Sequence, residues 1–146
     1  MNTRWTLTMD CAHPAELARF WALALGYVER EPPGDFATWE DWLRHYEVPE
    51  DEWDDGAALS DPDGVLPSLT FLKVPENKIA KNRIHLDLQV GGGRDDVPWE
   101  QRWPRVRAAA DKLIAAGATV LRTNELLGKP DSMVMADPEG NEFCLV

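Results

Sequence analysis

The stretch DPEGNEFCLV at residues 137–146 decides the fold. Asp137-Pro138-Glu139-Gly140 has the composition of a tight turn, and residues 141–146 have the pattern of a strand. A matching turn, Asp61-Pro62-Asp63-Gly64, is followed by a second strand pattern at residues 67–74. Two copies of one turn-and-strand unit predict internal repetition of the fold.

The repetition extends toward the N-terminal side of both turns. Apolar residues at helical spacing predict one helix from Pro14 to a stop at Gly26, and a second from Trp99 or Pro104 to a stop at Gly117. Further strand patterns lie at residues 3–11, 27–31, 57–60, 82–90, 118–123 and 132–136. Each half of the chain is therefore predicted to have the element order βαβββ.

One such unit cannot bury both faces of its sheet, whereas two together can. We therefore expect a single α+β domain over residues 1–146, in which two βαβββ repeats form a curved mixed sheet around a central cup. The first repeat spans residues 1–75 and the second spans residues 82–146. Residues 35–55 form an insertion that has no counterpart in the second repeat.

Composition narrows the range of functions. The chain of 146 residues is 44% hydrophobic, enough for a core, and carries a formal net charge of -11. This charge argues against binding to nucleic acid or to an anionic membrane surface. No apolar segment has the form of a signal peptide or a membrane span. Since Cys11 and Cys144 are the only cysteines, we expect a cytoplasmic protein with two free thiols.

Polar residues on alternating strand faces are the candidate site. His85 lies between Arg83 and Asp87 on the polar face of its strand, so it is a candidate general acid or base, with a structural histidine as the alternative. Glu142 shares a face with Cys144 and could act as an acid or base or form a salt bridge. We assign His85, Asp87 and Glu142 as candidate catalytic residues.

The remaining candidates would bind substrate. They are Thr6, Arg83, Cys144 and two tryptophans of the insertion, Trp39 and Trp42. The tryptophans could form a lid over the cup, pack a short helix onto the sheet, or make a dimer or partner surface. Cys144 could instead be a ligand, a reactive thiol or a small buried residue.

Four motifs together resemble the vicinal oxygen chelate superfamily, which includes glyoxalases, bleomycin-resistance proteins and extradiol dioxygenases. They are AELARFW at residues 15–21, LGY at 25–27, NRIHLDL at 82–88 and DPEGNEF at 137–143. The resemblance implies the paired βαβββ fold and a cup for a small molecule. It also implies a homodimer, since members of the family often pair.

The resemblance also implies where a metal would bind. Metal-using members place one ligand on each of the first, fourth, fifth and eighth strands, which correspond here to Thr6, Leu72, His85 and Cys144. Only His85 fits well, although Cys144 could bind zinc as a thiolate. We therefore expect no metal cofactor, while a divalent metal held by His85, Glu142 or Cys144 stays open.

Three functions follow from these observations. The first is a metal-independent protein that binds or transforms a small polar organic molecule in the cup. The second is a divalent-metal enzyme of the lyase, isomerase or dioxygenase type. The third is a dimeric accessory or resistance protein that acts by sequestration.

Overall fold

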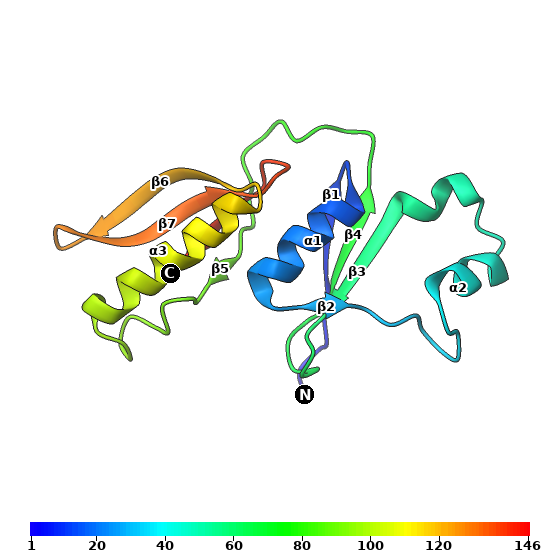
Figure 1. The fold of residues 1–146 in the computed structure, drawn as a ribbon, viewed down its shortest axis with the longest axis horizontal. Coiled ribbons are helices and arrows are strands. Elements are labelled where there is room, and N and C mark those ends of the chain that lie inside the picture. Colours follow the sequence, from blue (N-terminus) through cyan, green and yellow to red (C-terminus); the bar gives the residue numbers. More distant parts are fainter. The chain divides into compact units, whose positions relative to one another are not determined.

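Two four-stranded mixed sheets, each with one long helix packed on it, make up the fold (Figure 1). The computed structural model describes residues 1–146, which separate into the units Met1–Asn77 and Lys78–Val146. The protein is therefore of the α+β class, as the sequence predicts.

The first unit follows the expected order with one addition. Its elements are β1 (Leu7–Cys11), α1 (Pro14–Leu25), β2 (Val28–Glu29), α2 (Trp39–His45), the 3-10 helix η1 (Glu50–Asp55), β3 (Gly56–Ser60) and β4 (Leu69–Lys73). The strand order is β1-β4-β3-β2, with β1 parallel to β4 and the other pairs antiparallel. The insertion supplies α2 and η1.

The second unit repeats this arrangement without the insertion. Its elements are β5 (Asp87–Leu88), α3 (Trp99–Ala115), β6 (Thr119–Leu126), β7 (Lys129–Ala136) and β8 (Glu142–Leu145). The strand order β5-β8-β7-β6 is equivalent to that of the first unit, and again the first and last strands are parallel. The two βαβββ units are thus confirmed, and their joining around one cup stays a prediction.

Each helix buries one apolar stripe on its sheet. In the first unit Trp21 of α1 and Phe71 of β4 are almost fully buried, and Gly26 ends α1 in the left-handed conformation (φ 71°). In the second unit Val106 of α3 and Phe143 of β8 are fully buried. Burial of one such side chain contributes about 1.5–3 kcal/mol, so these stripes orient the helices on the sheets.

Strand β5 is shorter than the alternation at residues 82–90 predicts. Only Asp87 and Leu88 pair with β8, and Ile84, expected on a buried face, is 76% exposed. Strand β5 lies at the edge of its sheet, so its length is limited by its one neighbour, the four-residue β8. The alternating pattern of residues 82–90 therefore predicts a longer strand than the part of β5 that pairs with β8.

The β6–β7 hairpin is longer than the sequence predicts. Its strands reach Leu126 and Lys129 and are joined by Leu127 and Gly128, which both have positive φ (52° and 74°). Two positive φ angles are the requirement of a two-residue type I′ turn, which normally carries Asn-Gly or Asp-Gly. Because leucine is unusual there, the sequence does not mark the turn.

The insertion forms a short helix, α2, that begins with a capping threonine. Thr38 accepts a hydrogen bond from the main-chain N–H of Asp41 (3.1 Å), as an N-cap does. No residue of α2 or η1 is fully buried. None of the helices in the chain is long and apolar enough to span a membrane.

Candidate functional site

The first and last strands of the second unit place two polar side chains side by side. Asp87 lies opposite Cys144, and Leu88 lies opposite Leu145, in the parallel β5–β8 pair. Leu145 is fully buried on the side of the sheet that α3 covers. Since side chains alternate along a strand, Asp87 and Cys144 share the opposite face. His85, two residues before Asp87, comes to the same place.

His85, Asp87 and Cys144 form one cluster. His85 Nε2 lies 3.2 Å from Asp87 Oδ1, and both side chains are about half exposed. One potential ligand atom from each of the three residues lies within 4.8 Å of the others. The cluster joins residues separated by more than fifty positions in the chain, and Asp87 is its centre because it contacts both partners.

The environment keeps the Cys144 thiol protonated. Burial, then the negative charge of Asp87 and the hydrogen bond to its carboxylate, raise the pKa of Cys144. The thiol therefore donates to Asp87 at neutral pH. A protonated thiol is a poor nucleophile, so the cluster favours chemistry at the imidazole of His85. Asp87 fixes the orientation of that imidazole and leaves one ring nitrogen for a ligand.

Glu142 lies on the same face of β8 but has a partner of its own. Its carboxylate accepts a hydrogen bond from Lys81 Nζ. This bond, together with the positive charges of Lys81, Lys78 and Arg122, lowers the pKa of Glu142. Glu142 is therefore ionised at neutral pH and can orient a ligand or accept a hydrogen bond. It is less suited to donating a proton.

Two basic residues near the cluster were missed in the sequence. Arg122 lies opposite Val134 of β7, and Val134 lies opposite Cys144, so one row crosses the sheet from Arg122 to Asp87. Lys81 precedes the expected strand and pairs with Glu142. Alternation along residues 119–126 could have placed Arg122 on a polar face, but the cross-strand register was needed to bring it to Cys144.

The structure shows no contact between the cluster and the other predicted residues. Arg83 is exposed in the irregular segment before β5, and Thr6 is exposed one residue before β1. Trp39 and Trp42 belong to α2 of the first unit and line a cavity beside α1. Their roles in substrate binding stay predictions.

Comparison with known proteins identifies the chain. A family model described as a glyoxalase-like domain matches residues 6–146. The chain belongs to the glyoxalase-like domain family. No curated protein matches it.

Solved structures share the fold of this glyoxalase-like chain at low sequence identity. A glyoxalase/bleomycin resistance protein/dioxygenase family enzyme from Burkholderia phytofirmans PsJN is 14% identical with a TM-score of 0.58, over 96% of this chain and 94% of that one. A possible glyoxalase from Bacillus cereus is 14% identical with a TM-score of 0.60, over 100% and 99%.

A third neighbour contains a metal. A mutant of the fosfomycin resistance protein FosX from Listeria monocytogenes, complexed with Mn(II) and 1S,2S-dihydroxypropylphosphonic acid, is 11% identical with a TM-score of 0.60, over 99% of this chain and 91% of that one. At these identities the likeness supports the fold alone.

The four family positions for a metal are not all filled with ligands here. Leu72 is an apolar side chain on β4, and Thr6 offers only a hydroxyl, a weak ligand for divalent metals. The residues that could hold a metal are instead His85, Asp87 and Cys144, all in the second unit. The usual set of one ligand per strand therefore does not fit this chain.

Proposed function

We propose that this glyoxalase-like protein binds a small polar organic molecule at the cluster of His85, Asp87 and Cys144 in the β5-β8-β7-β6 sheet. His85 transfers a proton to or from that molecule without a metal. The main observation in support is the contact between His85 Nε2 and Asp87 Oδ1 at 3.2 Å, made by two side chains that are about half exposed. An imidazole held by a carboxylate and open to solvent is a suitable general acid or base.

The neighbouring residues support binding of a polar ligand. Glu142 is ionised, and the basic side chains of Lys81 and Arg122 act on it. Hydrogen-bond acceptors and positive charges therefore occur together next to His85. Cys144 stays protonated and positions Asp87 rather than attacking the ligand.

A divalent-metal enzyme is the second candidate function. It is favoured by the ligand atoms of His85, Asp87 and Cys144, which lie within 4.8 Å of one another. These three residues would hold the ion, and a bound divalent metal would supply Lewis-acid chemistry. Binding would require Cys144 to lose its proton, which its raised pKa opposes.

Metal content distinguishes the two candidates. We expect the purified protein to contain no stoichiometric metal, and we expect Zn, Ni, Mn, Fe(II) and Mg to leave its melting temperature unchanged. About one metal per chain, lost in His85→Ala, would instead establish the second candidate.

Ligand binding tests the first candidate directly. A panel of hydroxy acids, diols and phosphonates, including 1S,2S-dihydroxypropylphosphonic acid, is titrated into the protein and followed by NMR. We expect ligands that bind to lose affinity in His85→Ala and to retain it in His45→Ala. His45 is the matched control because it is an exposed histidine of α2. Equal binding by both variants would refute a role for His85.

A further inference from the structure

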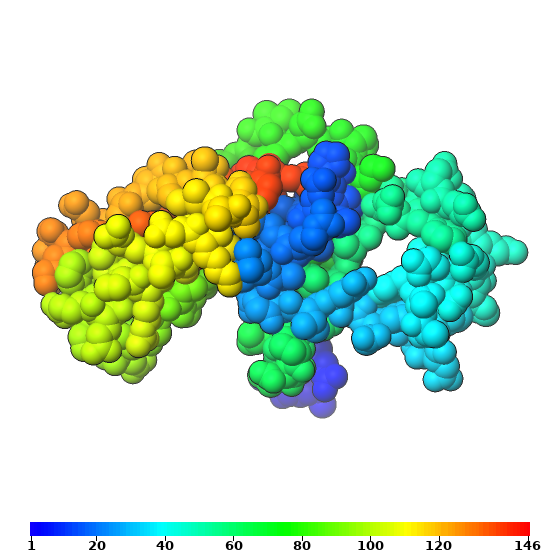
Figure 2. Space-filling view, viewed as in Figure 1, coloured from blue at the N-terminus to red at the C-terminus, as the bar shows by residue number.

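The first unit contains a cavity of about 670 Å³ between α1, β3 and the two short helices of the insertion. All of its lining residues lie between Ala15 and Thr70, and none belongs to the His85 cluster. The space-filling view shows a hollow between the insertion, in cyan, and the rest of the first unit (Figure 2). Cavities of 300–1,000 Å³ are typical of small-molecule sites.

Three tryptophans of the insertion line this cavity with their rings held in place. Trp39 Nε1 donates to the main-chain oxygen of Arg30 (2.8 Å), and Trp53 Nε1 donates to that of Val48 (3.0 Å). The Trp39 and Trp42 rings meet edge to face, with centroids 5.6 Å apart. Because two of the three indole N–H groups are bound to the main chain, the rings offer a ligand mainly their π surfaces.

The polar part of the lining is strongly acidic. Glu29, Glu40, Glu52 and Asp54 line the cavity, and Arg19 is its single basic residue. No ion pair joins any of the four carboxylates to a lysine or arginine. The cavity therefore combines uncompensated negative charge with aromatic walls, and both attract cations.

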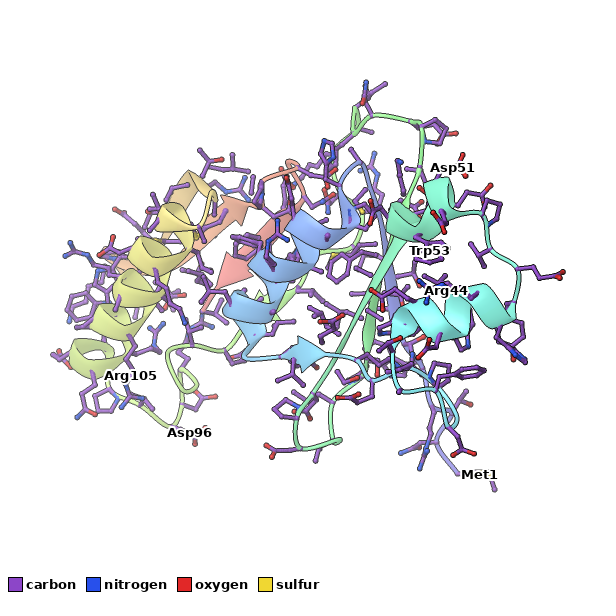
Figure 3. All side chains as sticks on the ribbon, turned by 45° about the vertical axis from the view of Figure 1, so that its right-hand side comes forward. Met1, Arg44, Asp51, Trp53, Asp96 and Arg105 are labelled. Atoms are coloured by element: carbon purple, nitrogen blue, oxygen red, sulfur yellow. The ribbon has the colours of Figure 1, made fainter.

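Within the insertion, one arginine already makes a cation–π contact with a tryptophan of the cavity wall. The guanidinium carbon of Arg44 lies 5.1 Å from the centroid of the Trp53 ring. Arg44 of α2 and Trp53 of η1 lie close together in Figure 3. The wall of the cavity is thus suited to a delocalised or alkylated cation. It is less suited to a bare metal ion, since indole faces offer no lone pair for a metal.

We propose that this cavity binds an organic cation, with its charged group between the tryptophan rings and the carboxylates and its apolar part against the alanines of α1. Ala15, Ala18 and Ala22 form that wall. Their small side chains leave room beside the helix. The proposal goes beyond the proton-transfer function and does not depend on it.

The test uses benzyltrimethylammonium as the probe, with benzyl alcohol and benzenesulfonate as the neutral and anionic controls. Binding to the full chain is followed through the tryptophan indole N–H signals in NMR spectra. We expect saturable binding of the cation, weakened by added salt, with shifts at Trp39, Trp42 and Trp53. The two controls are expected to bind less well or not at all.

A matched pair of double variants tests the role of charge. Glu52 and Asp54 of η1 line the cavity, whereas Glu50 and Asp51 of the same helix do not. E52Q/D54N is expected to weaken the cation about two- to thirty-fold, since each exposed ion pair contributes roughly 0.2–1 kcal/mol. E50Q/D51N removes the same charge and is expected to change affinity less than about two-fold, because Glu50 and Asp51 do not line the cavity.

Several outcomes would overturn the proposal. They are equal binding of the three probes, no binding of the cation, equal weakening by the two double variants, or loss of cation binding in His85→Ala. Trp42→Ala adds a further check. If it dissociates a dimer and the wild-type protein does not bind the cation, the tryptophans form an interface between copies of the chain.

Discussion

Replacing Asp131 of β7 with alanine should destabilise the second unit strongly. Arg102 of α3 and Asp131 are 5% and 6% exposed. Arg102 Nη2 donates to Asp131 Oδ1 (2.6 Å), and Nη1 donates to the main-chain oxygen of Asp131 (3.0 Å). The carboxylate thus compensates a buried guanidinium whose Nε has no partner.

The expected cost follows from leaving that guanidinium unpaired. Removing one partner of a buried ion pair costs about 3–5 kcal/mol, whereas replacing both partners with apolar residues is often neutral. We expect Asp131→Ala to lower the free energy of unfolding in urea by that amount. R102M/D131L should lie within about 1–2 kcal/mol of the wild type. Arg94→Gln, which removes the exposed second partner of Asp131, should cost less than about 1 kcal/mol.

The same pair predicts a dependence of stability on pH. The hydrogen bond from Arg94, then the hydrogen bond and charge of Arg102, lower the pKa of Asp131 in the folded protein. Its stabilising contribution is complete above the unfolded carboxyl pKa of about 3.9 and is lost as the pH falls through the lower folded value. The wild type should therefore lose more stability below pH 4 than Asp131→Asn does. A loss under about 1 kcal/mol in Asp131→Ala, or equal losses in the single and double variants, would refute this reasoning.

Two further predictions concern Cys144 and the β6–β7 turn. Because burial and Asp87 raise the pKa of Cys144, iodoacetamide should modify the Cys144 thiol slowly at pH 7.5. Asp87→Asn should lower that pKa and so speed the reaction, whose rate is measured by peptide mass spectrometry. An unchanged rate would count against the contact between Asp87 and Cys144. Leu127 has φ 52° and is 95% exposed. Since asparagine tolerates positive φ better than leucine does, Leu127→Asn should stabilise the protein by roughly 0.5–1 kcal/mol. A lower melting temperature in this variant would contradict the prediction.

Much of the fold could be predicted because the signals are local and occur twice. The turns at Asp61 and Asp137, the helix stops at Gly26 and Gly117, and the apolar stripes of α1 and α3 each depend on neighbours in sequence. Repetition strengthened them, since two weak patterns in the same order exclude most other folds.

Local patterns failed where a partner strand decides the outcome. The alternating pattern at residues 82–90 carries no information about the length of the partner strand β8, and the pairing with β8 includes only two residues of β5. The turn at Leu127 is imposed by the pairing of the strands around it, against the preference of leucine for negative φ.

The sequence by itself determined the repeated βαβββ pattern, because turns, helix stops and apolar stripes depend on neighbours in the chain. It also put His85 close to Asp87, because only one residue separates them. Only the tertiary structure brought Cys144 and Arg122 to that pair and Lys81 to Glu142, since strand order and register decide which distant residues meet. The same holds for the cavity in the first unit. Its tryptophans and carboxylates are distributed over β2, α2 and η1, and their common lining depends on how these elements pack with β3 and α1.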